Sequence, residues 1–101
     1  MNTLDKLQSD DFTLYLNQLF HIHLNETESI SLELVSVTES GARSQPETRT
    51  PFSIHFLGPV SPQYLIQSTY HFEHDQMGVL DLFIVPLGPE RGRMRYEAIL
   101  S

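Results

Sequence analysis

The sequence predicts a mainly β protein: a small antiparallel barrel of six strands with one short N-terminal helix. From Phe20 onward, apolar and polar residues alternate with a period of two, whereas helical periodicity occurs only before that point. Glycine, proline and polar clusters separate the alternating runs, as expected for short connections between antiparallel strands. A two-sheet sandwich is the alternative, but a barrel leaves no long strand edge exposed. The 101 residues are expected to form a single globular β domain, 1–101.

The helix is predicted near residues 10–17. Ser9 is the expected N-cap, and Asp10 and Asp11 fall in the first turn, where carboxylates interact favourably with the helix dipole. Asn17 tolerates the left-handed conformation and is expected to end the helix. The apolar residues that recur at the spacing of one helical face are Phe12, Tyr15, Leu16 and Leu19.

The first hairpin is predicted to join a strand over residues 20–24 to a strand over residues 30–34 through a polar turn. Residues 39–50 contain Ala42 as their single apolar side chain and are predicted to form an exposed loop, either mobile or functional. A third strand, with Phe52, Ile54 and Phe56 on its apolar face, is expected to stop at Gly58-Pro59.

A second hairpin is predicted at the turn from Asp75 to Gly78, because Asp at the first position and Gly at the last suit a type I turn with a left-handed residue. With Gly78 as the last residue of a three-residue loop, the expected register pairs Phe72 with Leu82 and Tyr70 with Ile84. The strand over residues 79–85 is apolar on both faces apart from Asp81 and is therefore predicted to be central.

Two further segments complete the barrel. The connection over residues 62–67 carries apolar side chains and is expected to fold back over an open end of the core. The last strand is predicted to direct four side chains inward, namely Met94, Tyr96, Ala98 and Leu100.

Composition narrows the function. The formal charge of −7 argues against a nucleic-acid partner and against binding to an anionic membrane. The absence of cysteine excludes disulfides and thiolate chemistry. No signal peptide or transmembrane segment is predicted, so the expected location is cytoplasmic by default.

Two clusters contain histidine. His21 and His23 point the same way from a strand, and Glu28 follows, so these three are the candidate metal ligands. The expected arrangement is instead an exposed polar strand face without a metal. His71 and Glu73 also share one face, and their surface pairing is favoured over an acid–base role. Neither catalytic residues nor a cofactor is predicted.

The cationic segment Arg91-Gly92-Arg93-Met94-Arg95 holds three of the five arginines of the chain. Glycines and a proline beside it indicate a hairpin tip exposed to solvent. Because arginine is enriched at interface hot spots, Arg91, Arg93 and Arg95 are the candidate partner-binding residues.

Four stretches together resemble a family of short bacterial proteins known only as a domain of unknown function. They are Asp11-Phe12, residues 51–59, residues 70–89 and Met94-Arg95-Tyr96-Glu97-Ala98. The resemblance implies no activity, cofactor or catalytic residue. It implies an association with phage-tail-collar-like proteins, which suits a role in assembly or binding.

Three functions follow from these observations. The first is a non-enzymatic protein-interaction or assembly accessory module with another protein as its partner, because a long polar loop is displayed on a β scaffold. The second is a small β-barrel that binds a ligand or metal through histidines. The third is a small hydrolase or isomerase.

Overall fold

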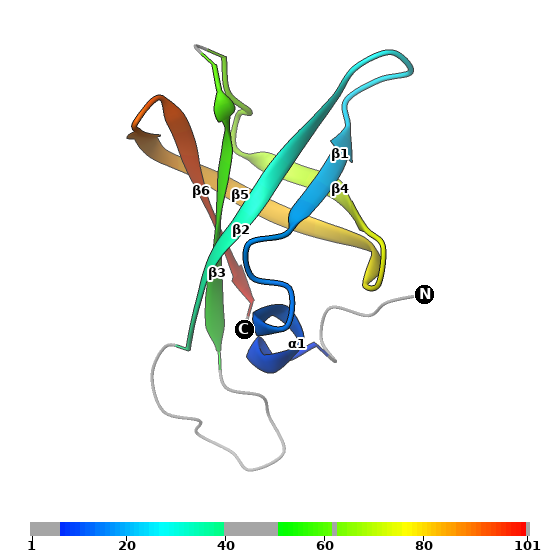
Figure 1. The fold of residues 1–101 in the computed structure, drawn as a ribbon, viewed down its shortest axis with the longest axis vertical. Helices are drawn as coiled ribbons and strands as arrows, with labels where there is room; N and C mark the ends of the chain where they lie inside the picture. Colours follow the sequence, from blue (N-terminus) through cyan, green and yellow to red (C-terminus); the bar gives the residue numbers. More distant parts are fainter. Residues whose placement is uncertain (1–6, 40–50, 62, 101) are drawn as a thin grey trace.

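A closed barrel of six antiparallel strands follows one short helix in the computed structural model, which describes residues 7–39, 51–61 and 63–100 (Figure 1). Around the barrel the strands run in the order β1-β2-β3-β6-β5-β4, and β4 pairs with β1 to close it. The predicted six-stranded barrel is therefore confirmed, and the sandwich is not formed. In chain order the elements are α1 (Ser9–Thr13), β1 (Leu19–His23), β2 (Ser29–Glu39), β3 (Phe52–Val60), β4 (Ser68–His74), β5 (Gly78–Glu90) and β6 (Arg93–Leu100).

The core follows from the period-two alternation. Every second residue of β3 from Phe52 to Phe56 is buried, as predicted, because successive side chains of a strand point to opposite faces. Of the inward residues predicted for β6, Tyr96, Ala98 and Leu100 are buried, and Met94 is partly buried against the core. A six-stranded barrel is narrow enough for its own side chains to fill the interior.

The two ends of the barrel differ, and Figure 1 places α1 at one of them. At this helix end, buried Phe12 contacts Phe52, with ring centroids 5.7 Å apart. The opposite end, which we call the open end, is formed by the β1–β2 turn, the end of β3, the segment after it and the β5–β6 hairpin.

The helix is shorter than predicted, since α1 ends at Thr13 and not near residue 17. Gln8, not Ser9, is the N-cap, because the Ser9 hydroxyl donates instead to Glu39 at the end of β2, at 2.7 Å. Asn17 adopts the predicted left-handed conformation, with φ 70°. The chain then turns into β1, so Leu19 lies on the outer face of a strand, 51% exposed, and not on a helical face.

The predicted register of the second hairpin is wrong by two residues, because Phe72 pairs with Leu80 and Tyr70 with Leu82. The faces stay correct, since a shift of two residues preserves which side chains point inward. His74 pairs with Gly78, so the turn is centred one residue earlier than expected. Nδ1 of His74 accepts the N–H groups of Gln76 and Met77 at 3.2 and 3.3 Å, and this contact fixes the turn.

Strand β5 lies between β4 and β6, as every barrel strand lies between two others. Its outer face is nevertheless not covered, because Val79 and Phe83 are 55% and 51% exposed. The strand predicted to be apolar and buried on both faces is therefore buried on its inner face alone. Strand β2 continues to Glu39, and the rest of the loop predicted over residues 39–50 lies outside the described residues. No helix in the described ranges is long and apolar enough to cross a membrane.

Candidate functional site

The open end of the barrel is shaped by two bulges on either side of β6. In β3 the register shifts between Leu57 and Val60, and in β5 it shifts between Pro86 and Gly88. An extra residue in one strand bends it and increases its local twist. Both neighbours of β6 are therefore bent at this end, while their pairing with β6 continues beyond the bulges.

Glycine and proline explain where the bulges form. Gly58-Pro59 lies within β3 and does not end that strand as predicted. Gly88-Pro89 lies within β5, before the hairpin tip and not in it. Proline cannot donate a ladder hydrogen bond, and within a sheet it is tolerated at edges and bulges. Gly88 has φ 138°, a conformation that other residues rarely adopt.

The segment between β3 and β4 crosses the open end, as predicted. Leu65 is buried in the core, and its N–H donates to the hydroxyl oxygen of Tyr96 at 2.8 Å. The Tyr70 hydroxyl donates to the carbonyl of Ile66 at 2.9 Å. Burial raises the pKa of Tyr96, so its hydroxyl stays protonated while it holds the segment.

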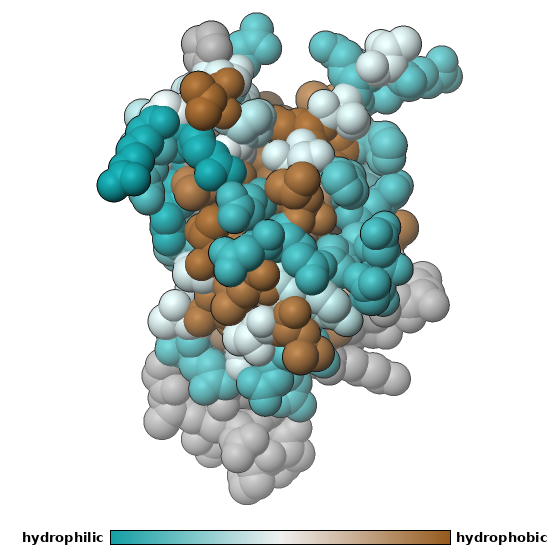
Figure 2. Space-filling model, viewed as in Figure 1, coloured by the Kyte–Doolittle hydropathy of each residue, from teal (hydrophilic) through white to brown (hydrophobic). Residues whose placement is uncertain are grey.

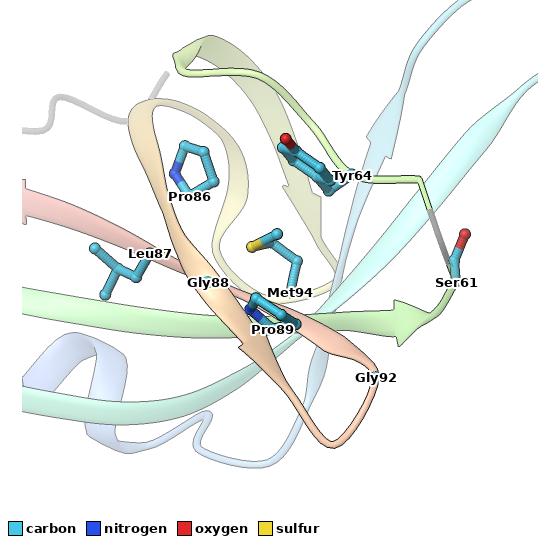
Figure 3. A pocket seen from close by; sticks show the side chains of 8 residues that line it. All are labelled: Ser61, Tyr64, Pro86, Leu87, Gly88, Pro89, Gly92 and Met94. Carbon is cyan, nitrogen blue, oxygen red and sulfur yellow. The ribbon is translucent and has the colours of Figure 1, made fainter.

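A cleft of 530 Å³ opens beside this segment (Figure 3). Figure 3 shows the Met94 side chain lying between Tyr64 and the β5 residues Pro86 and Pro89. The volume lies within the ~300–1,000 Å³ typical of ligand sites. The residues that line the cleft are Ser61, Tyr64, Pro86, Leu87, Gly88, Pro89, Gly92 and Met94.

A second cleft, of 510 Å³, shares Ser61 and Tyr64 with the first and reaches the β1–β2 turn at Glu28. Figure 2 shows apolar side chains at the notch between that turn and the end of β3. Several large apolar side chains are exposed at this end, including Val60 at 77% and Ile66 at 71%.

The predicted arginine tip is divided by the structure. Nε of Arg93 donates to the carbonyl oxygen of Gly58 at 2.6 Å, and its Nη2 donates to Oε1 of Glu33 at 3.0 Å. Arg93 therefore supports the bulge in β3. Arg91, with φ 55°, occupies the turn between β5 and β6 and is exposed.

Arg95 takes part in a hydrogen-bond network on the outside of the barrel. Its Nη1 donates to Oε2 of Glu90 at 3.0 Å and its Nε to Nδ1 of His55 at 2.9 Å. Nε2 of His55 lies 3.0 Å from Oε2 of Glu97. Because Nδ1 of His55 accepts from Arg95, the ring proton lies on Nε2 and is donated to Glu97. These hydrogen bonds join β3, β5 and β6. They give His55 a structural role, whereas the sequence predicted no role for it.

The three candidate metal ligands do not converge. Nδ1 of His21 lies 2.8 Å from the Ser31 hydroxyl, and Nε2 of His23 lies 3.3 Å from Oε1 of Glu73. Glu28 accepts instead from the amide of Asn25 at 2.9 Å. Within the described ranges, no group of three or more His, Asp or Glu side chains is placed to hold a metal ion.

His71 and His74 lie on opposite faces of β4. His71 faces outward and pairs with Asp81 across the hairpin. His74 is buried at the helix end, where its ring stacks on Phe20 with centroids 4.5 Å apart and Nε2 donates to Oε1 of Gln18 at 2.7 Å. Neither histidine lines a cleft at the open end.

Fold and site together define a small closed β-barrel with an apolar cleft at one end. The family model described as Domain of unknown function (DUF6916) matches residues 7–100, so the chain belongs to that family. The resemblance to a family of unknown function is therefore confirmed. No curated protein and no solved structure matches the chain.

Proposed function

We propose that this protein is a non-enzymatic interaction module that binds another protein through the cleft at the open end. The observation that carries the proposal is a 530 Å³ apolar cleft at a barrel end whose connecting segment is fixed by buried Leu65 and Tyr96. A site held in place before binding loses less conformational entropy when a partner docks.

The lining favours binding over catalysis. Among the described residues of the cleft wall, the polar side chains are the hydroxyls of Ser61 and Tyr64, without an imidazole or carboxylate. General acid–base chemistry is most often carried out by an imidazole, and also by carboxylates, within hydrogen-bond reach of the reacting atoms. Exposed Tyr64 and Leu87, at 55% and 50%, are instead suited to bury apolar surface of a partner.

The first partner to test is a tail-collar-like protein, because the family resemblance implies that association. The test uses co-expression of the tagged barrel with a tail-collar-like protein encoded by the same organism, followed by affinity purification and measurement of the complex. We expect Leu87→Ser to weaken the complex, because it removes exposed apolar surface at the cleft.

Leu19→Ser is the matched control, since Leu19 is exposed to the same extent, 51% against 50%, but lies in β1 outside the cleft. Both variants should melt at nearly the wild-type temperature, because surface substitutions usually change stability by less than ~0.5 kcal/mol. Equal retention of a captured partner by both variants would place the interface elsewhere and overturn the proposal.

A further inference from the structure

All the described cationic side chains lie on one hairpin, since the remaining three cations, Lys6, Arg43 and Arg49, fall outside the described residues. Arg93 is held by Glu33, and Arg95 by Glu90. Arg91 is exposed, and no acidic side chain in the described ranges pairs with it. Among the described residues, the hairpin therefore presents one arginine without an acidic partner, in a chain of net charge −7.

The residue that carries this charge adjoins the cleft wall along the chain. Gly92, the residue that follows Arg91, forms part of the cleft wall together with Pro89 on the other strand of the hairpin. Figure 3 shows Gly92 at the turn, beyond the apolar side chains that border the cleft. The hairpin thus carries apolar residues of the cleft wall and, in the residue next to Gly92, an exposed arginine.

We propose that the cleft takes an apolar peptide segment of a partner protein that carries a carboxylate beside its apolar side chains. The inference rests on the proposed function and names the chemistry of the partner. Apolar side chains fill the space beside Met94 and Tyr64, and the carboxylate accepts hydrogen bonds from the guanidinium of Arg91.

The second cleft gives the bound segment a direction. It shares Tyr64 with the first cleft and is lined by Glu28 at the opposite side. A carboxylate placed there would be repelled, whereas one at the hairpin would be attracted. The acidic side chain of the partner therefore lies towards Arg91 and away from the β1–β2 turn.

The test is a nuclear magnetic resonance titration of the isotope-labelled barrel with synthetic peptides. The probes share a Leu-Phe core with blocked ends and differ in the next residue, which is Asp, Ser or Lys. We expect shifts at the amides of Leu87, Gly88, Gly92 and Met94, which line the cleft. An exposed ion pair stabilises by ~0.2–1 kcal/mol, so the Asp peptide should bind about 1.5- to fivefold tighter than the Ser peptide.

Arg91→Gln should abolish this preference while leaving the Ser peptide unaffected. Its matched control is Gln76→Glu, which makes the same change in net charge at the other end of β5. The control should keep the preference. Added salt should weaken the charge-dependent part of binding in wild type and in the control, and should leave the affinity of Arg91→Gln unchanged.

Three outcomes would overturn the inference. Equal affinity for the Asp and Lys peptides at the cleft would remove the charge preference but leave the proposed interaction module standing. Cleft shifts that depend on protein concentration without peptide would make a second copy of the chain the occupant. Binding of every peptide outside the cleft would exclude the site, and the Leu87→Ser experiment would then decide whether a protein partner uses it.

Discussion

At the helix end of the barrel, Phe12 is fully buried and packs on Phe52, whereas the open end carries a cleft between Tyr64 and the prolines of β5. Aromatic rings fill the first end, and bulged strands border the cleft at the second. Filling an opening with side chains adds buried apolar area, and leaving it open makes that area available to a partner. From this comparison we propose that the helix end contributes mainly to stability and the open end to binding.

The largest expected change in the free energy of unfolding comes from a substitution at the helix end. Phe12→Ala should lower the free energy of unfolding by ~3–5 kcal/mol, because it removes a buried aromatic ring and leaves a cavity. Leu87→Ala at the open end should change it by less than ~0.5 kcal/mol. Denaturant unfolding of both variants measures the difference. Equal losses at the two ends would show that the open end also holds the fold together.

Tyr96→Phe sharpens the boundary between the two ends. It leaves the ring in the core but removes the oxygen that accepts the N–H of Leu65. A buried donor left without a partner costs ~1–3 kcal/mol, so unfolding should become easier by that amount. Hydrogen exchange at the Leu65 amide should also accelerate. Tyr70→Phe, which removes an exposed hydrogen bond to Ile66, is the control and should cost less. Unchanged exchange at Leu65 would contradict this account of the segment.

Arg93→Ala tests the support of the bulge in β3. We expect a loss of about 1 kcal/mol, because its contacts to Gly58 and Glu33 are charge-assisted but about a third exposed, where solvent screens them. Arg91→Ala should be nearly neutral in stability. Thermal melting of both variants measures this difference, and a larger loss from Arg91→Ala would reverse the roles assigned to the two arginines.

The sequence predicted the two ends of the barrel with different success. Alternation assigned the inward faces of β3 and β6 correctly, because pleating imposes a period of two on any strand. Glycine and proline were misinterpreted at the open end, since Gly58-Pro59 and Gly88-Pro89 also occur at strand ends, and only pairing on both sides of β6 makes them bulges. Two Gly-Pro dipeptides within apolar runs were the available indication of the cleft.

Side-chain contacts between distant segments limited the other predictions. The turn after β4 is set by the buried ring of His74, which accepts hydrogen bonds from two backbone N–H groups. These contacts override the turn position that Asp75 and Gly78 favour locally. The sequence predicts that Arg93 faces a partner, but in the structure it binds Glu33. Glu33 lies 60 residues away along the chain, so spacing in the sequence could not indicate this contact.

The smallest expected effect is a pH dependence confined to the helix end. Burial lowers the pKa of His74, with opposing contributions from Asp75, which raises it, and His21, which lowers it further. The geometry agrees, because Nδ1 accepts two amide N–H groups and cannot also carry a proton without losing them. The folded protein therefore holds this histidine neutral at pH values where the unfolded chain protonates it.

The sign follows from proton uptake. Stability rises with pH wherever the unfolded state binds more protons, so the His74 contribution is lost as pH falls below ~6.5, the ordinary histidine pKa. We expect wild type to lose more stability than His74→Asn between about pH 7.5 and about pH 5.5. Denaturant unfolding at both values measures this difference. His71→Asn is the control for loss of a histidine from the same strand, because His71 is exposed on the outer face. If His74→Asn and wild type lost equal stability on acidification, the buried ring would titrate as freely in the folded protein as in the unfolded chain, and the helix end would contain no acid-sensitive contact at this position.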